Sequence, residues 1–442
     1  MIFHFLKYLQ PTSYFQLSRT DGSSVFPIAS ELPEGVMEQI KADENFKSEL
    51  ASQYDVSWQA IQKGYIGDTL TYKNFEKLPL EDEYRFVRKY FHPFWSLYVL
   101  MIRLMSLKNP INEIRSCWKN WHVQRLQFAD SPILYSKWVG FKSDLVNKNP
   151  LVSVVIPTLN RYHCLKDVLR DFEKQTYSNF ELIIVDQSNP YNEDYYSNFS
   201  LNIQLIRQEE PALWLARNTA IQASKAQIIM LSEDDVRIFP NWIEEHLKCL
   251  DFFKAQISAG VFYPEGSSIP KHRSFFSVAS QFATGNAALY RSVFQKIGLF
   301  DRQFERQRMG DGEFGLRAFL YGIKSVSNPK ASCIDVKASV GGLPQMGSWD
   351  AFRPKKLFSP RPIPSVLYFF RKYYGSSSAR WSLLKTIPSS IIPYRFKQNK
   401  KILTLGIVIS LFLLPIVLIQ VFISWRKSSE KLTQGAIIGE LK

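Results

Sequence analysis

The middle of the chain is predicted to adopt an α/β fold, in which parallel strands alternate with helices. Three short apolar runs, 151–156, 180–185 and 227–232, are typical of buried strands. Apolar residues at helical spacing separate the first two runs, and the interval has the length of one βαβ unit. Polar residues follow each run, so three strand ends are expected at one sheet edge, where open α/β sheets bind ligands.

The third run ends in three acids, Glu233, Asp234 and Asp235. Carboxylates this close repel one another, and burying them unpaired costs free energy. A divalent cation relieves both problems, and hard oxygen ligands suit Mg²⁺ or Mn²⁺. The alternative is a solvated acidic turn at the end of a strand.

The other two strand ends supply polar neighbours for these acids. Pro157, Thr158, Asn160 and Arg161 follow the first run, and Asp186 ends the second. The chain contains neither the Gly-x-Gly-x-x-Gly fingerprint after its first strand nor a P-loop, so a metal is expected to hold the phosphates. The pattern therefore points to a nucleotide diphosphate bridged by a cation.

A series of motifs in order resembles the family 2 glycosyltransferases over about residues 150–345. The motifs are 152–161, 180–186, 215–218, 231–236, 284–291, 297–301 and 310–317. Each motif is weak alone, and their order carries the resemblance. It implies a GT-A fold with a Rossmann-like mixed sheet, a nucleotide-sugar donor with UDP-sugars favoured, a divalent metal and an inverting single displacement.

The resemblance also implies roles for matching residues. Asp311 matches the general base, and Asp235 matches the metal ligand, with Glu233 and Asp335 as further metal candidates. The donor-binding candidates are Pro157, Thr158, Asn160, Arg161, Asp186, Arg217 and Asp234. Three positions depart from the family: Glu233 replaces a common Asp, Gly310 replaces the Glu before the base, and Asp335 replaces a common His.

An inverting transfer needs a carboxylate that takes the proton of the acceptor hydroxyl. Gly310 and Gly312 flank Asp311, so its carboxylate is expected to be openly presented. The alternative for Asp311 is a helix N-cap. The alternative for Arg217 is a solvated charge on a helix.

The 442 residues are enough for two or three domains. The start lacks the pattern of a secretory signal, and four widely spaced cysteines indicate reduced thiols. Residues 1–149 are expected to be mainly helical, with an unknown role. Their most apolar part, 94–107, is too short to span a bilayer and favours a buried helix over an interfacial one. His246 and His272 are expected to be surface histidines.

The C-terminal part indicates a membrane. Residues 353–401 hold twelve Lys and Arg, interleaved aromatics and no acid, which suits anionic lipids or nucleic acid. Residues 402–424 carry no charge, which favours lipid over nucleic acid as the partner of the basic segment. We expect a transmembrane helix at 402–425 with a kink at Pro415. A re-entrant hairpin and a buried soluble helix are the alternatives. We therefore expect a basic membrane-proximal segment at 346–401 and a polar tail at 426–442.

The larger cation cluster precedes the apolar helix, so we expect a single-pass inner-membrane protein with a cytoplasmic catalytic domain. We expect metal-dependent sugar transfer to a glycan or a lipid-linked acceptor in surface polysaccharide assembly, with no nucleic acid partner. The Gln-x-x-Arg-Trp sequence of processive synthases is absent, which favours transfer of single sugars. A nucleotidyltransferase and a catalytically inactive, membrane-tethered donor-binding scaffold are the alternatives.

Overall fold

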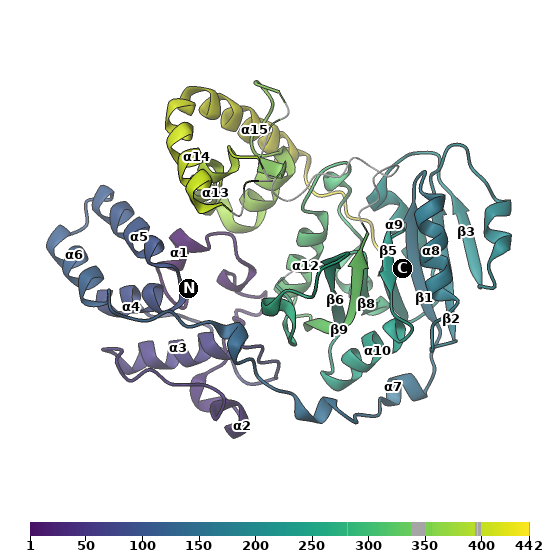
Figure 1. Ribbon diagram of the computed structural model, residues 1–442, viewed down its shortest axis with the longest axis horizontal. Coiled ribbons are helices and arrows are strands. Elements are labelled where there is room, and N and C mark those ends of the chain that lie inside the picture. Colours follow the sequence, from purple (N-terminus) through teal and green to yellow (C-terminus); the bar gives the residue numbers. More distant parts are fainter. Residues whose placement is uncertain are drawn as a thin grey trace. The chain divides into compact units, whose positions relative to one another are not determined.

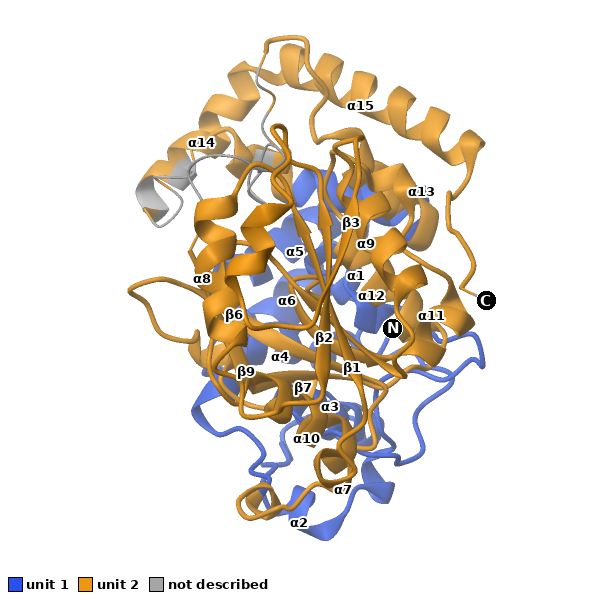
Figure 2. Ribbon diagram, turned by 90° about the vertical axis from the view of Figure 1, so that its right-hand side faces the viewer, with its two compact units in different colours: residues 1–135, 374–385 blue, residues 136–373, 386–442 orange. Residues whose placement is uncertain are grey.

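The computed structural model describes residues 1–280, 282–336, 350–352, 354, 356–393, 396 and 399–441. Unit 1 comprises residues 1–135 and 374–385, and unit 2 comprises residues 136–373 and 386–442 (Figures 1 and 2). The boundary falls after Tyr135 and not after residue 149, because the Trp138 ring packs on Phe252 and Phe276 of unit 2, at 5.3 and 4.6 Å between centroids.

Unit 1 is a helical unit with an aromatic core. Its helices are α1 Leu6–Leu9, α2 Glu34–Met37, α3 Glu49–Gln62, α4 Leu80–Tyr90, α5 Pro93–Met105 and α6 Pro110–Lys119. In the core, Phe3 stacks on Phe86 with ring centroids 3.7 Å apart. The fully buried Asp55 accepts hydrogen bonds from Lys89 at 2.6 Å and Tyr90 at 2.5 Å, which joins α3 to α4.

Unit 2 is built on a nine-stranded mixed sheet, as the sequence predicts. The strands are β1 Val152–Thr158, β2 Phe180–Asp186, β3 Ile203–Arg207, β4 Ile228–Ser232, β5 Val236–Ile238, β6 Ile257–Pro264, β7 Ser277–Val278, β8 Asn286–Tyr290 and β9 Ser325–Asp335. Their order is β3-β2-β1-β4-β8-β6-β9-β5, with β7 on β9. The β1, β2, β3 and β4 strands run parallel, so their carboxyl ends meet at one edge.

Helices cover both faces of this sheet, which explains why β1 is buried along its whole length. Val152, Val154 and Ile156 point to the face covered by α8 (Tyr162–Phe172) and α10 (Trp242–Phe252). The helix α9 (Leu213–Ala223) contacts β1 and β2 from the other face (Figure 2).

The remaining helices are α7 Asp144–Asn147, α11 Arg291–Ile297, α12 Gly310–Leu320, α13 Pro364–Ser390, α14 Lys400–Phe412 and α15 Leu414–Gln434. The helix α13 breaks at Gly375, where φ is 77°, a left-handed conformation that glycine adopts without steric cost. Residues 374–385 of α13 belong to unit 1, and the rest of the helix belongs to unit 2.

The predicted single helix at 402–425 is replaced by two. Within the described residues, no single helix is long and apolar enough to cross a bilayer, but 405–412 and α15 pass together, across a bend of 83°. The break lies at Leu413, two residues before Pro415, because proline lacks an amide hydrogen and its ring collides with the preceding turn. By length and composition, this bent pair of helices fits either a broken membrane span or the re-entrant hairpin that was the alternative.

The basic segment contains cations that bond inside the protein. Arg361 donates to Gln420 at 3.0 Å, and Arg371 donates to Ser428 at 2.6 Å and stacks on Trp425. The Nζ of Lys372 lies 3.6 Å from Asp301. These cations fix α13 to the rest of unit 2, so they are unavailable to lipid headgroups. Arg353, Lys355, Arg395 and Lys397 lie outside the described residues.

The predicted polar tail is a structured part of unit 2. The helix α15 continues to Gln434, and the segment after it runs beside residues 299–303. Leu299 donates to the Gly439 carbonyl at 2.8 Å, and the Ile437 amide donates to the buried Asp301 at 2.9 Å.

A buried polar cluster locks α10 to the sheet. Asn286 of β8 accepts hydrogen bonds from Trp242 at 2.9 Å and donates to the Ala331 carbonyl of β9 at 3.0 Å. His246 bridges Asn286 and Ser258, at 2.9 and 2.8 Å. The expectation of a surface His246 is therefore wrong. The side chain is fully buried, and burial lowers the pKa of His246 to about 4, so it is neutral.

We expect Asn286→Ala to destabilise the protein by about 2 to 4 kcal/mol, because it leaves several buried donors and acceptors without partners. Thermal unfolding of the full chain in mild detergent measures the loss. Asn202→Ala, at an exposed position of the same unit, is the control and should change stability by less than about 0.5 kcal/mol. Equal melting temperatures for the two variants would contradict the assigned role of the cluster.

Candidate active site

The ends of β1 and β4 meet in a buried polar cluster. The Thr158 hydroxyl donates to Asp234 Oδ2 at 2.8 Å. Arg161 Nη1 donates to Asp234 Oδ1 at 3.1 Å and to Asp235 Oδ2 at 3.0 Å. All four side chains are buried. The structure thus brings together four of the predicted site residues, and the solvated-turn alternative for the acids is wrong.

Arg161 holds two carboxylates that would otherwise repel each other. Burial alone would lower the pKa of Arg161, but the charges of Asp234 and Asp235 outweigh it and raise that pKa. Burial raises the pKa of Asp234, and the charge of Arg161 opposes this rise. The arginine therefore offsets part of the cost of burying these adjacent carboxylates at the sheet edge.

A second arginine faces the first acid of the run. Arg217 is buried, which contradicts the solvated alternative, and its Nη2 lies 3.2 Å from Glu233 Oε1. Burial lowers the pKa of Arg217, and it raises the pKa of Glu233 to about 7, although 40% of the Glu233 side chain stays exposed. Gly285 permits this position, because a Cβ there would lie 2.5 Å from Glu233 Cδ.

Asp311 is exposed in the first turn of α12. The helix begins at Gly310 and its N-cap is Met309, whose φ is 84°, so Asp311 does not cap the helix. Its Oδ1 accepts a hydrogen bond from the adjacent Gly312 amide at 2.8 Å. The charge of Asp311 acts on the buried Arg217, which places its carboxylate on the side of the site that Arg217 and Glu233 form.

Trp214 explains why Gly310 replaces the glutamate that the family resemblance implies. A Cβ at Gly310 would lie 2.3 Å from Trp214 Cζ2, so the indole fills the space of a side chain. The same ring lies under the Arg217 guanidinium at 5.2 Å. Its indole nitrogen donates to the Phe304 carbonyl at 3.1 Å. Trp214 therefore positions both Arg217 and the start of α12.

Asp186 lies at the end of β2, in register with Thr158. It is fully buried, and its Oδ2 accepts the hydroxyls of Tyr162 and Tyr196, each at 2.7 Å. Its Oδ1 accepts the Ser188 amide at 2.8 Å. A donor base that reaches Asp186 must therefore share Oδ1 or displace a tyrosine.

Pro157 and Asn160 shape the loop after β1. Pro157 is buried within the strand, opposite Val185. Asn160 has a φ of 55° and links this loop to the one after β2, since its amide donates to Ser188 and its side chain accepts the Asn189 amide, both at 2.8 Å. These hydrogen bonds therefore hold the two loops together.

Asp335 ends β9 and pairs with Val236 of β5, next to Asp235. The charges of Asp235, Asp234 and Asp335 all raise the pKa of Glu233, so the four carboxylates form one electrostatic cluster. The cluster contains four acids and the two arginines Arg161 and Arg217, and carboxylate oxygens are ligands that suit a divalent cation. In the part of the chain that the structure describes, however, no three acids, histidines or cysteines form a ready metal cage.

Sequence reasoning missed Trp214, Tyr162, Tyr196 and Glu305. Glu305 accepts the Trp214 and Leu215 amides at the start of α9, at 3.2 and 3.3 Å. Trp214 precedes the Leu215–Asn218 motif by one residue, which is the one signal that the sequence offered. Tyr162 begins α8, Tyr196 lies in the short 3-10 helix Asp194–Asn198, and Glu305 follows the one at Arg302–Phe304. Their spacing in the sequence follows no recognisable pattern.

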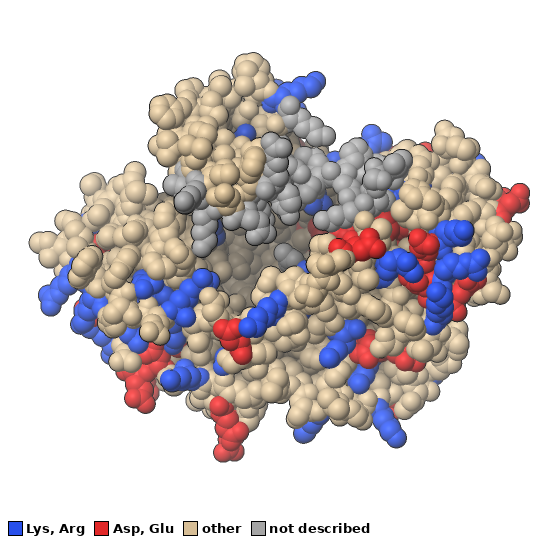
Figure 3. Space-filling view, in the orientation of Figure 1, with Lys and Arg blue, Asp and Glu red and all other residues tan. Residues whose placement is uncertain are grey.

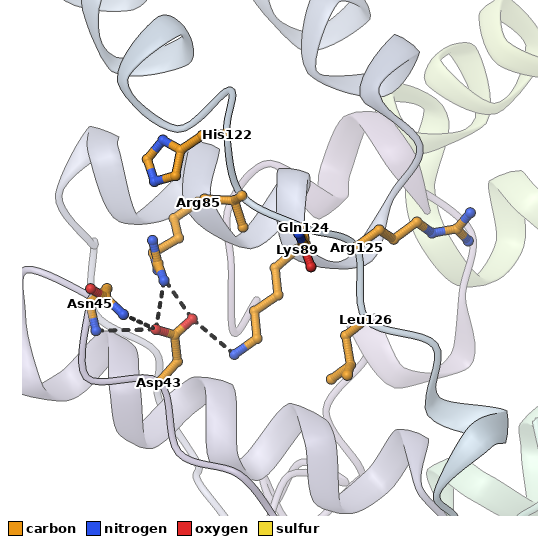
Figure 4. A pocket seen from close by; sticks show the side chains of 9 residues that line it. Asp43, Asn45, Arg85, Lys89, His122, Gln124, Arg125 and Leu126 are labelled. Carbon is orange, nitrogen blue, oxygen red and sulfur yellow. Dashed lines mark hydrogen bonds and ion pairs between the residues drawn. The ribbon is translucent and has the colours of Figure 1, made fainter.

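Unit 1 contains a separate polar pocket of about 430 Å³ (Figure 4). Asp43 lies on its floor and accepts from Arg85 at 2.7 Å and Lys89 at 3.1 Å, while the labelled Arg125 points away from this group. The lining residues are Asp43, Asn45, Arg85, Lys89, His122, Val123, Gln124, Arg125 and Leu126. Because both cations are paired with Asp43, this carboxylate is a poor general base, and we assign no reaction to the pocket.

Comparisons with known proteins find similarity in unit 2, which contains this site. Residues 153–303 match the family described as Glycosyl transferase family 2. Chondroitin synthase of Escherichia coli is 28% identical over 171 residues, 37% of this chain and 24% of that protein. Glycosyltransferase GlyA of Streptococcus pneumoniae serotype 4 is 25% identical over 162 residues, 36% of this chain and 22% of that protein. The chain thus spans under a quarter of either relative.

Among solved structures, the mannosyltransferase PcManGT from Pyrobaculum calidifontis, in complex with GDP-Man and Mn²⁺, superposes with a TM-score of 0.41. It is 15% identical, and the match covers 67% of this chain and 91% of that one. This likeness is too loose to bear on what the present chain binds.

We expect Arg161→Met to destabilise the protein by about 3 to 5 kcal/mol, because it leaves two buried carboxylates without their shared partner. The loss should shrink as pH is lowered, since without Arg161 the folded-state pKa of Asp234 rises and protonation below it relieves the repulsion. Thermal unfolding at several pH values tests both points. Arg170→Met, which removes an exposed ion pair, should cost under about 1 kcal/mol and show no such pH trend.

We expect Gly310→Ala to cost about 1 to 3 kcal/mol, because its Cβ collides with the Trp214 ring. Gly310→Glu, which introduces the residue implied by the family pattern, should cost at least as much. Gly35→Ala is the control, since a Cβ there meets nothing within 4 Å. A stable Gly310→Glu protein would show that Trp214 is not fixed in this position.

Proposed function

We propose that the protein transfers a sugar from a nucleotide diphosphate sugar to a hydroxyl acceptor with inversion, because residues 153–303 match glycosyl transferase family 2. The observation that carries the proposal is the convergence of Thr158, Arg161, Asp234 and Asp235 at the carboxyl edge of the parallel strands. Open α/β sheets bind their ligands at such edges.

The donor occupies this edge. Asp186 and Asn160, with Pro157 shaping the loop, meet the nucleoside, and a UDP-sugar is favoured. Arg217 lies on the opposite side of the acids and faces the diphosphate. Among the described residues, no acceptor reaches the buried Nε of Arg161 or Arg217, so each guanidinium keeps a donor that a ligand oxygen or water would satisfy.

A divalent cation, Mg²⁺ or Mn²⁺, would be held by Asp235, with Glu233 and Asp335 as neighbouring oxygen donors. When bound, it supplies positive charge to the leaving diphosphate. The role of Asp234 is to position Arg161 and Thr158 and to contact the ribose or sugar. The excess of carboxylates over arginines supports this arrangement.

Asp311 is the general base. Its exposure at the start of α12 leaves the carboxylate open to an acceptor hydroxyl. Its charge opposes the lowering of the pKa of Arg217 by burial, which supports a position for Asp311 near the donor. The carboxylate removes the hydroxyl proton as the oxygen attacks the anomeric carbon, opposite the departing diphosphate.

The pair α14–α15 attaches the protein to a membrane, with the catalytic unit on the cytoplasmic side. In α15, polar Gln420, Ser424 and Ser428 face inward, whereas apolar Leu418 and Phe422 are exposed. An outward apolar face suits lipid, in the plane of the membrane or as a re-entrant hairpin. The acceptor is accordingly a glycan or a lipid-linked glycan in surface polysaccharide assembly.

We expect the full chain in detergent to release one nucleoside diphosphate from a panel of nucleotide sugars with Mg²⁺ or Mn²⁺, and to stop when a chelator is added. Asp311→Asn should lower this release by about 10² to 10⁴-fold while donor binding persists, because only proton removal is lost. Luminescent detection of the diphosphate and calorimetric donor binding give the two readouts, with Asp194→Asn as the exposed control.

Other outcomes distinguish the alternatives. Binding without release, even with glycan acceptors, would favour the inactive scaffold. Pyrophosphate release would identify a nucleotidyltransferase. Failure of every nucleotide sugar to bind would overturn the donor site at Asp186 and Asp235.

A further inference from the structure

The helix α6 of unit 1 buries polar residues and exposes large apolar ones. A helix on the surface of a water-soluble protein turns its apolar side inward. In α6 the buried residues are Glu113, Ser116 and Cys117. The exposed residues include Ile111, at 74%, and Trp118, at 75%. Water is therefore a poor environment for the outer face of this helix.

The neighbouring helix α5 extends the same surface, which corrects the expectation of a buried helix at 94–107. Ser96, Val99 and Ile102 are buried, and the opposite stripe is exposed. The apolar residues of this outer face of α5 and α6, including the connecting Leu107, are Phe94, Leu97, Met101, Met105, Leu107, Ile111, Ile114, Trp118 and Trp121. The two helices contact each other, so the stripes form one surface. Patches of this kind mark interaction sites.

The cations beside this face outnumber the acids, although Lys119 pairs with Glu81 of α4 at 2.9 Å. Between residues 91 and 129 the chain has five Lys and Arg and a single acid, Glu113. That acid is buried and bonds to Arg103 at 2.5 Å and Tyr84 at 2.8 Å, so it adds no negative charge to the surface. Lys108 and Arg115 are exposed beside the apolar residues. Figure 3 shows tan surface over α5 and α6, with blue side chains along its lower border.

We propose that the outer face of α5 and α6 docks in the headgroup region of an anionic lipid bilayer. With 13 residues, α5 is about 20 Å long, too short for the hydrocarbon core, so the helix lies in the membrane plane. Cations beside an apolar face match anionic headgroups, and exposed tryptophans are typical of the membrane interface. This contact is separate from that of α14–α15 and does not depend on the reaction that unit 2 performs.

The test places an environment-sensitive fluorophore on α6 of the full chain reconstituted with vesicles of phosphatidylcholine and phosphatidylglycerol in equal parts. Ile114→Cys carries the label in a Cys164→Ser background, since the other three cysteines are buried. Glu49→Cys, exposed on α3 of the same unit, is the matched control. Spin-labelled lipids then report insertion, because they quench a fluorophore only within the bilayer.

We expect quenching at position 114 and none at position 49, with weaker quenching at 114 in pure phosphatidylcholine. Because α14–α15 holds the chain on either kind of vesicle, absence of quenching at 114 would overturn the proposal without touching the proposed function. Equal quenching at 114 and 49, or equal quenching at 114 on both kinds of vesicle, would also overturn it. A spectral shift that depends on protein concentration without lipid would assign the face to a second copy of the chain.

A second variant separates insertion from folding. Ile111→Ser with Ile114→Ser and Trp118→Ser changes only exposed side chains, so the helix content should stay unchanged. Quenching of a label at Met105→Cys should fall by about tenfold or more in this variant, because much of the inserted apolar area is lost. Changing Leu411, Phe412 and Leu418 to Ser should leave the quenching of the label at position 105 unchanged in those chains that remain bound to vesicles.

Discussion

The candidate active site depends on how two buried arginines hold a run of carboxylates at the end of β4. Arg161 joins Asp234 to Asp235, and Arg217 pairs with Glu233. Arg161 directly precedes α8, and Arg217 lies in α9. Their ion pairs therefore also hold these two helices against the end of β4. Within this cluster, the two arginines hold carboxylates that would otherwise repel one another.

The core of the sheet was predictable because β1, β2 and β4 are continuous apolar runs that end at once in polar residues. The convergence of Thr158, Asp186 and the three acids follows from the parallel order of β2, β1 and β4. The partners of these residues were not predictable. Nothing in the spacing of Tyr162 and Tyr196 indicates that both hydroxyls meet Asp186, and Gly310 is explained only by the position of the Trp214 ring.

The sequence-based assignments failed where hydrophobicity was used without direction. The apolar stretch at 94–107 suggested a core helix, and 402–424 suggested a single span with a kink at Pro415. In both regions the structure instead has helices whose inner sides carry buried polar residues, such as Ser96 in α5 and Gln420 in α15, which accepts a hydrogen bond from Arg361. A count of apolar residues cannot tell whether the apolar side of a helix faces the core or the solvent. The bend before α15 has a different origin, because Pro415 has no amide hydrogen to donate to the preceding turn.

The contact between Asp301 and Ile437 joins residues 136 positions apart. During synthesis, the apolar helices α14 and α15 leave the ribosome before Ile437 does. Residues 299–302, which precede α12, therefore gain these backbone partners only after Ile437 and Gly439 have left the ribosome. This part of unit 2 is thus completed late in synthesis, although its own residues are made much earlier.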